Sequence, residues 1–260
     1  MNGHHFILTN FNIDFKDQYT MPHTSIEHVF DNNLNKAKEN DTFIGDDYLY
    51  DKKGVATQTD EWLENRIELF EKYTLPSVLR QTDKNFIWVI RCSKKTPDIL
   101  FKYLGMGVHI EICYTNFTDF LKSYINKHPA EYIITSRLDS DDWLIRTYVA
   151  EIKKNFTGEI GILDVDGFQF DSVKKSFYIG KYSSPPSWFA GKVSPFLSLI
   201  ERVTDNQQPL SVYFADHLEM GEHFKILKKI DLKLYAQVIH DNNLSNEIIG
   251  EETEVSTEEL

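Results

Sequence analysis

Short apolar runs alternate with amphipathic segments along the first half of the chain. The apolar runs have the length of buried strands and lie at residues 6–8, 85–92, 108–114 and 132–134. The segments between them carry apolar residues at helical spacing and lie at 61–81, 96–104 and 117–128. Strands that alternate with helices of this length predict a mostly parallel central sheet flanked by helices, an α/β fold.

The second half of the chain predicts a smaller antiparallel portion. Residues 161–171 and 176–182 look like two strands that meet in a hairpin. A helix is expected over 143–156, and another begins within 194–203, where Pro195 occupies its first position. The apolar run 234–240 completes the ordered part. The chain contains neither an internal repeat nor a low-complexity linker, so a single domain over residues 1–246 is expected.

Composition and charge narrow the class of protein. The chain is 41% hydrophobic, as expected for a globular domain, and its formal net charge of -12 argues against binding to nucleic acid. Residues 247–260 carry six Glu and no Lys or Arg, which is typical of a solvated, mobile, disordered tail. Cys92 and Cys113 form no metal-binding pattern and are expected to be buried free thiols. With neither a long apolar span nor a secretory signal, a cytoplasmic protein is expected, with peripheral membrane contact left open.

The most distinctive chemistry lies in residues 131–144, where an apolar run ends in clustered acids. Arg137 is followed by Asp139, Asp141 and Asp142. Three carboxylates within four residues repel each other, and a bound cation relieves that repulsion. The carboxyl ends of parallel strands are where α/β sheets bind their ligands. We therefore expect Mn²⁺ or Mg²⁺ on these three aspartates, bridging a diphosphate whose oxygens also contact Arg137.

Other interpretations of the acidic stretch differ in strength. A calcium loop that begins at Asp139 would need Gly and Glu where the chain has Leu144 and Ala150, so that interpretation is excluded. Aspartates also favour the first turn of a helix, and this alternative stays open. Asp164 and Asp166 form a second candidate metal site on one face of a strand.

One histidine extends the predicted metal site. His240 follows the apolar run 234–239, and a neutral imidazole there would complete a mixed nitrogen and oxygen shell suited to Mn²⁺. A hydrogen-bonded histidine at the end of a strand is the alternative. His217 and His223 are six residues apart, which is not the spacing of a helical zinc site.

These residues together resemble a known family. The sequence Arg137-Leu-Asp-Ser-Asp-Asp resembles the DxD element of glycosyltransferases with the GT-A fold, and the chain as a whole resembles the bacterial putative rhamnosyltransferase family. The chain differs from the expected family pattern at position 10, where the family is expected to have Arg and this chain has Asn10. The segments that carry the resemblance are residues 5–12, Trp62 with Arg66, 69–70, 74–78, Gln81, 85–90, 136–142 and 238–243.

The resemblance implies both a fold and a reaction. It implies a GT-A-type, Rossmann-like domain with a nucleotide-binding half at about 1–143 and an acceptor-binding half at about 144–246. The implied reaction moves a sugar, expected to be rhamnose, from a nucleoside-diphosphate sugar to a glycan or lipid-linked oligosaccharide in surface polysaccharide synthesis. It is a single inverting displacement in which a carboxylate deprotonates the acceptor hydroxyl.

The resemblance also suggests residue roles. Asp216 is the first candidate for the catalytic base, and Glu219 and Glu222 are alternatives. Trp188 and Phe189 lie in a turn-rich loop and are the acceptor-binding candidates, since aromatic rings suit the apolar faces of pyranoses. The donor-binding candidates are Thr9, Asn10, Phe11, Asn12, Arg66, Arg91, Arg137 and Asp139.

Two other functions compete with glycosyl transfer. A sugar nucleotidyltransferase would share the carboxylates and the metal, but it should carry a glycine-rich phosphate loop after the first strand, and this chain has none. A non-catalytic carbohydrate-binding protein would need neither a diphosphate nor a base.

Overall fold

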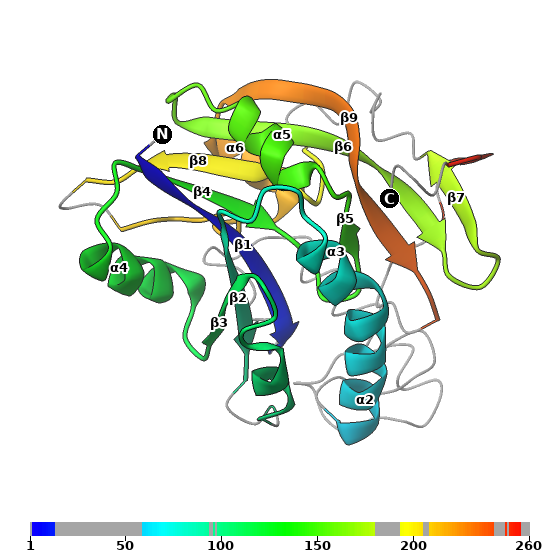
Figure 1. Cartoon of the computed structure of the whole chain (residues 1–260). Helices are drawn as coiled ribbons and strands as arrows, with labels where there is room; N and C mark the ends of the chain where they lie inside the picture. Colours follow the sequence, from blue (N-terminus) through cyan, green and yellow to red (C-terminus); the bar gives the residue numbers. More distant parts are fainter. Residues whose placement is uncertain are drawn as a thin grey trace.

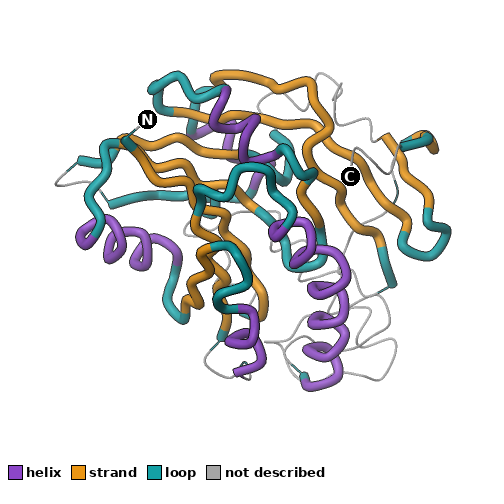
Figure 2. Tube along the Cα trace, in the orientation of Figure 1, coloured by secondary structure: helices purple, strands orange, loops and turns teal. Residues whose placement is uncertain are grey.

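A computed structural model describes residues 2–13, 59–93, 96, 98–179, 193–204, 208–241, 248 and 250–255. Trp188 and Phe189 lie outside these residues. The described part contains a ten-stranded mixed sheet in the order β10-β7-β6-β8-β4-β1-β2-β3, and β9 joins it by pairing with both β5 and β6 (Figure 1). The strands form one continuous band from the parallel edge to the long β6 and β9 (Figure 2).

The parallel half of the sheet consists of the four apolar runs identified in the sequence. β1 (Gly3–Asn12) lies between β2 (Ile87–Cys92) and β4 (Tyr132–Arg137), and β3 (His109–Cys113) forms the edge. All three pairings are parallel. The predicted fold class, a mixed α/β sheet with a mostly parallel core, is confirmed.

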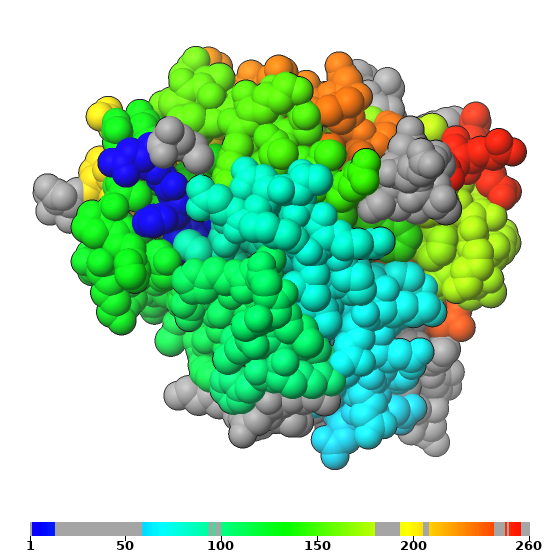
Figure 3. Space-filling model, in the orientation of Figure 1, coloured from blue at the N-terminus to red at the C-terminus, as the bar shows by residue number. Residues whose placement is uncertain are grey.

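Helices cover both faces of this sheet. On one face, α2 (Asp60–Leu69) continues through the π-helix η2 (Phe70–Thr74) into α3 (Leu75–Leu79). Thr59 caps α2, because its Oγ1 accepts a hydrogen bond from the Trp62 amide at 3.3 Å. In the space-filling view only part of β1 is visible, in blue, and α2 forms the cyan surface beside the teal and green segments that follow it in the chain (Figure 3).

The remaining helices complete the two layers. The 3₁₀ helix η3 (Asp98–Tyr103) and α5 (Tyr148–Lys154) pack on the same face as α2. α4 (Phe117–Lys127) and α6 (His217–His223) pack on the opposite face. The first hydrophobic core therefore lies between the sheet and the helices α2, α3 and α5, and the second lies under α4 and α6.

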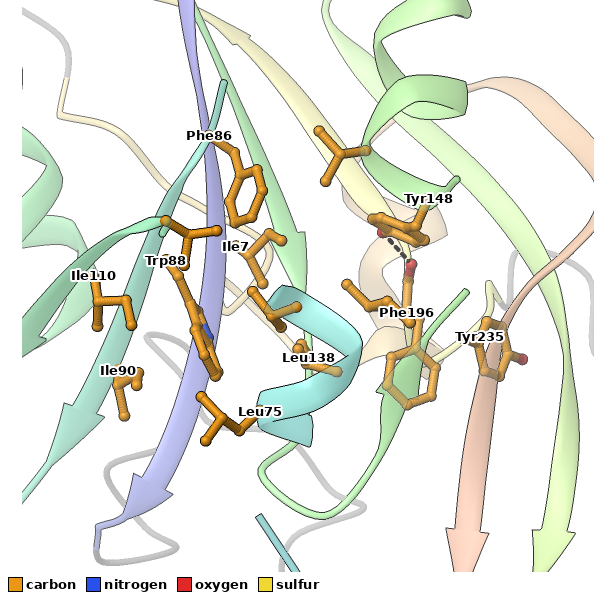
Figure 4. Packing of buried hydrophobic residues seen from close by; sticks show 14 of the residues in the cluster. Ile7, Leu75, Phe86, Trp88, Ile90, Ile110, Leu138, Tyr148, Phe196 and Tyr235 are labelled. Atoms are coloured by element: carbon orange, nitrogen blue, oxygen red, sulfur yellow. Dashed lines mark hydrogen bonds between the residues drawn. The ribbon is translucent and has the colours of Figure 1, made fainter. Parts of the chain in front are cut away.

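Aromatic side chains fill the first core. The Trp88 ring stacks on Phe70 with centroids 5.4 Å apart, and its Nε1 donates to Thr9 Oγ1 at 3.0 Å. Figure 4 shows the Tyr148 hydroxyl donating to the Phe196 carbonyl, a bond of 2.8 Å. These buried donors all have acceptors, as buried polar groups require.

The C-terminal half contains the predicted hairpin. β6 (Gly161–Asp171) pairs antiparallel with β7 (Ser176–Ile179) and parallel with β9 (Ile226–Ile239). β8 (Ser198–Arg202) lies between β4 and β6 and is antiparallel to both. β8 thus joins the antiparallel part to β4, which lies at the opposite end of the parallel strands from β3.

Three local predictions differ from the structure. The helix expected within 194–203 is wrong, because Ser198–Arg202 is a strand. Both faces of that strand are buried, so its sequence lacks the alternation that identifies strands. The helix expected over 143–156 begins only at Tyr148, after β5 (Trp143–Leu144) has paired with β9. In the acidic tail, β10 (Glu251–Thr253) is an edge strand antiparallel to β7 rather than part of a disordered end. No helix among the described residues is long and apolar enough to cross a membrane.

Gly167 makes room for an aromatic ring within β6. It faces Tyr235 on β9, and a Cβ at position 167 would overlap the atoms of the Tyr235 ring. Tyr235 is 4% exposed and packs on Phe196 with centroids 4.2 Å apart. Glycine inside a strand commonly marks such a close approach.

Gly167→Ala should lower the free energy of unfolding by about 1–3 kcal/mol, because the new methyl group displaces the Tyr235 ring. Urea denaturation measures this. The double variant Gly167→Ala/Tyr235→Leu should lose less unfolding free energy than the two single variants lose in sum, since the smaller side chain at position 235 leaves space for the methyl group. Strict additivity would contradict the proposed contact.

A buried polar chain links β1, β4, β8 and α5. His5 Nε2 lies 2.7 Å from Ser136 Oγ, which lies 2.6 Å from Ser198 Oγ, and the Tyr148 hydroxyl lies 3.1 Å from Ser198 Oγ. Burial lowers the pKa of His5 from 6.5 to about 3, with a smaller contribution from Lys153. The imidazole is therefore neutral in the folded protein at neutral pH.

The depressed pKa of His5 predicts acid sensitivity. Between pH 6.5 and about 3 the unfolded chain binds a proton at His5 that the folded chain does not, so stability is full above pH 6.5 and falls as the pH decreases. The contribution is up to about 1.4 kcal/mol per pH unit. Denaturation at pH 7.5 and 5 should show a shallower decrease for His5→Gln than for the wild type. The exposed His109→Gln serves as control, and equal slopes for His5→Gln and wild type would contradict the assignment.

Candidate active site

Three strand ends meet at the site. The carboxyl ends of β1 and β4 are adjacent, because Leu8 pairs with Arg137 in parallel register. The loop after β4 carries Asp139, Asp141 and Asp142, and β9 ends just before His240. Parallel pairing thus brings the acidic stretch to the edge of the sheet that the sequence predicted.

The Asp141 carboxylate lies between the guanidinium of Arg66 and the imidazole of His240. Its Oδ2 lies 2.6 Å from Arg66 Nη1 and 2.9 Å from His240 Nε2. All three residues are at most 8% exposed. Burial alone would raise the pKa of Asp141, but the Arg66 guanidinium and the His240 hydrogen bond outweigh it and hold the pKa well below its usual range.

Asp142 is oriented away from this pair by a backbone contact. Its Oδ1 accepts a hydrogen bond from the Val238 amide at 2.6 Å, and the residue is 1% exposed. Burial raises the pKa of Asp142 well above its usual value, and the charges of Asp141 and Asp139 raise it further. The Asp142 carboxylate therefore links the loop to β9, and its role as a metal ligand stays a prediction.

Asp139 forms the outer part of the site. Arg137 Nε and Nη2 each donate to one of its carboxylate oxygens at 3.1 Å, a bidentate pair. The Asp139 side chain is 30% exposed, which makes it more accessible than the other two acids. The Arg137 guanidinium also lies over the Tyr213 ring, 5.4 Å from its centroid.

The first candidate base, Asp216, lies at the start of α6. Asp216 caps this helix, because its Oδ1 accepts from the Leu218 amide at 2.8 Å. The same oxygen lies 3.2 Å from His217 Nδ1, which lies 3.4 Å from Arg137 Nη1. Asp216 is 8% exposed. His217 Nδ1 therefore lies between the Asp216 carboxylate and the Arg137 guanidinium.

The two alternative bases lie further along α6. Glu219 is half-buried and Glu222 is exposed, so Glu222 faces solvent. Of the three candidates, Asp216 lies nearest to Arg137 along the chain of contacts described above, with His217 Nδ1 between them.

Sequence reasoning missed Tyr213 and His217. The Tyr213 ring stacks on Phe117 with centroids 5.0 Å apart and supports Arg137 from below. Burial raises the pKa of Tyr213, and the negative charge of Asp139 raises it further. The dipeptide Asp216-His217 at a helix start was the available signal, but histidine spacing alone does not detect it.

The donor-binding candidates at the end of β1 fall into two groups. Thr9 accepts from Trp88 and Phe11 packs edge-on against Phe70 at 5.3 Å, so both side chains belong to the core. The amide oxygen and nitrogen of Asn10 are buried, and within the described residues neither has a hydrogen-bond partner. Asn12 donates to Thr96 Oγ1 at 3.2 Å, while its Oδ1 is also buried and unpaired.

Arg91 completes this end of the sheet. It pairs with Asn10 across β1 and β2, and its guanidinium lies 5.9 Å from the centroid of the Phe117 ring. Of the predicted donor-binding residues, Asn10, Asn12 and Arg91 therefore lie together at the ends of β1 and β2.

The second candidate metal site is not assembled. Asp164 is buried and accepts from the Ser194 amide at 2.8 Å. Asp166 forms an ion pair with Lys233 and accepts from the Gly167 amide at 2.8 Å. The pairing of β6 with β9 is irregular on both sides of Asp166, so the regular alternation that would place both acids on one face is interrupted there.

Comparison with known proteins identifies the family. Residues 48–252 match the family described as "Putative rhamnosyl transferase". This segment spans most of the chain and contains Arg66, the acidic loop, Asp216 and His240. The chain belongs to this family. No curated protein matches it significantly.

The solved structures that this chain resembles are distant from it. One S. aureus TarS structure matches 67% of this chain and 35% of its own length, at 14% identity and a TM-score of 0.40. The "TarS 1-349" structure matches 90% of this chain and 60% of its own, at 11% identity and 0.39. A Bacillus anthracis "Putative Glucose-1-Phosphate Thymidylyltransferase" in complex with sucrose matches 89% and 87%, at 10% identity and 0.34. The chain spans about a third of the first TarS structure and 60% of the second.

The site fits a divalent cation only in part. Among the described residues, no three His, Cys, Asp or Glu side chains converge on one point. Asp141 and His240 do converge, and together they offer the oxygen and nitrogen ligands that Mn²⁺ accepts. Cations that act on phosphates commonly take one or two protein ligands and complete their shell with phosphate and water. Asp141 and His240 are thus the residues that would hold a metal in this family member.

Asp141→Asn and Asp142→Asn should differ in stability, measured by urea denaturation in metal-free buffer. Asp141→Asn leaves the buried Arg66 without its counter-charge and should cost about 3 kcal/mol. Asp142→Asn keeps an oxygen for the Val238 amide and removes no ion pair, so it should cost less than about 1 kcal/mol. Equal losses, or a larger loss for Asp142→Asn, would contradict these two environments.

Proposed function

We propose that the protein is a metal-dependent inverting glycosyltransferase. It moves a sugar, rhamnose in the first instance, from a nucleoside-diphosphate sugar to a hydroxyl group of a glycan or lipid-linked oligosaccharide. The observation that carries this proposal is a pair of side-chain groups beside the loop after β4, in a chain that belongs to the rhamnosyl transferase family. One group is Arg137 with Asp139 and the neighbouring Asp216, and the other is Asp141 with His240.

The ends of β1 and β2 suit the nucleoside of the donor. The Asn10 amide has no partner among the described residues, and it offers donor and acceptor groups that match those on the edge of a nucleobase. Asn12 Oδ1 also has no partner in that part of the chain and is a suitable acceptor for a ribose hydroxyl. Arg91 lies beside both and adds positive charge for the phosphates.

The diphosphate lies near Arg137 in this proposal. The Arg137 guanidinium is already oriented by Asp139 and by the Tyr213 ring, so little reorganisation accompanies phosphate binding. A divalent cation held by Asp141 and His240 would supply Lewis-acid stabilisation of the leaving diphosphate. Arg137 adds hydrogen bonds to the same developing charge.

Asp216 is the base in this proposal. The acceptor oxygen forms a bond to the anomeric carbon while the bond from that carbon to the phosphate oxygen breaks, and the diphosphate leaves with the electron pair. The hydroxyl proton passes to the Asp216 carboxylate. The Leu218 amide holds the Asp216 carboxylate at the start of α6, and His217 Nδ1 lies 3.2 Å from the same oxygen.

Trp188 and Phe189 bind the acceptor in this proposal, since aromatic rings suit the apolar faces of pyranoses. The family resemblance supports a role in surface polysaccharide synthesis, at the cytoplasmic side of the membrane with peripheral membrane contact.

Asp216→Asn should lower the rate of sugar transfer by about 10²–10⁴-fold, because the amide cannot accept the proton. A panel of nucleoside-diphosphate sugars with Mn²⁺ identifies the donor, and release of nucleoside diphosphate measures turnover. Donor affinity should remain within a few-fold of the wild type.

Glu222→Gln is the matched control on the exposed side of α6 and should keep wild-type turnover. Loss of turnover in Glu219→Gln, with Asp216→Asn active, would assign the base to Glu219. If no nucleoside-diphosphate sugar is turned over with any divalent metal, glycosyl transfer as proposed is contradicted.

A further inference from the structure

Arg66 occupies the position that a cation needs in this site. Its Nη1 lies 2.6 Å from Asp141 Oδ2, and His240 Nε2 lies 2.9 Å from the same oxygen. Asp141 and His240 are the pair that would hold a metal, so the oxygen shared between them is also the oxygen that Arg66 contacts. The guanidinium therefore serves as the counter-cation of Asp141 in the structure.

The surroundings of Arg66 keep its charge at the site. The side chain is 8% exposed, and the Trp62 ring lies under the guanidinium, 4.8 Å from its centroid. Arg66 lies in the last turn of α2, directly before the π-helix Phe70–Thr74. The Phe70 amide is shared between the carbonyls of Arg66 and Ile67, a three-centre bond that is common at helix ends.

Two cations cannot share one carboxylate oxygen without strong repulsion. When Asp141 and His240 bind a divalent ion, Arg66 has to leave Asp141, and a buried guanidinium then requires another anion. The neighbouring carboxylates are committed, since Asp139 pairs with Arg137 and Asp142 accepts from Val238. The anion that the proposed reaction brings to this place is the donor diphosphate.

We propose that Arg66 exchanges between two partners, Asp141 in the free protein and the donor diphosphate in the loaded protein. This inference rests on the proposed function and adds a coupling to it. Metal ions alone compete with Arg66 for Asp141, whereas a diphosphate draws Arg66 away and leaves Asp141 open. Metal and diphosphate therefore bind with positive cooperativity, and the coupling is reciprocal.

Isothermal titration calorimetry tests the exchange, with MnCl₂, UDP and dTDP as ligands added singly and in pairs. In the wild type, each diphosphate that binds should tighten Mn²⁺ binding at least about tenfold, and Mn²⁺ should tighten that diphosphate by the same factor. Arg66→Met keeps the apolar stem and removes the charge. It should bind Mn²⁺ alone at least about tenfold more tightly than the wild type and bind diphosphate more weakly. Its coupling should be several-fold smaller than that of the wild type, because only the direct contact between metal and phosphate remains.

Arg80→Met is the matched control, since Arg80 lies at the exposed end of α3, where its Nε donates to the Pro76 carbonyl at 3.3 Å. It should reproduce the wild-type values. Arg66→Met leaves Asp141 without its cation, so Mn²⁺ should also raise the melting temperature of this variant more than that of the wild type. Arg66→Lys keeps a charge and should give an intermediate coupling.

Different failures overturn different claims. Mn²⁺ binding that is equally weak in Arg66→Met and the wild type, with the coupling intact, overturns the exchange and leaves the glycosyltransferase proposal standing. Equal melting-temperature shifts in the two proteins have the same meaning. A wild type that binds neither Mn²⁺ nor a nucleoside diphosphate overturns the metal-dependent function and the exchange together.

Discussion

The contact of Asp141 with Arg66 and His240 holds the site together. These residues come from the end of β4, from α2 and from the end of β9, which are far apart in the sequence. Their contacts of 2.6 and 2.9 Å fix the helix layer and the antiparallel part of the sheet against the parallel strands. Because the carboxylate is buried, loss of Arg66 removes its counter-charge, and loss of His240 removes a hydrogen bond. The geometry that permits chemistry is therefore also a structural constraint.

The three aspartates occupy three different environments. Asp141 is paired with Arg66, Asp139 is paired with Arg137, and Asp142 is buried with a raised pKa. The repulsion inferred from the sequence is thus largely relieved by internal cations and burial. Such a site suits an anion as much as a metal, since it holds two buried arginines, Arg66 and Arg137. This property connects the proposed donor binding to the exchange of Arg66.

Sequence patterns predicted the parallel strands and the acidic edge because each strand is a distinct apolar run between polar turns. They failed at Ser198–Arg202, where a strand buried on both faces has no alternation that separates it from a helix. His240 was placed correctly beside Asp141, since both follow buried strands. The partner of Asp141 in α2 was not predicted, because a contact between residues 66 and 141 depends on how the helix packs on the sheet.

The central claim is that Asp141 and His240 receive a metal when Arg66 turns to a diphosphate. The most direct measurement is X-ray diffraction from crystals grown with Mn²⁺ and the bound nucleoside diphosphate, using anomalous scattering to locate manganese. The account predicts an anomalous peak at Asp141 and His240, with the Arg66 guanidinium on a phosphate oxygen. Bound diphosphate without a manganese peak, and with Arg66 still on Asp141, would contradict it.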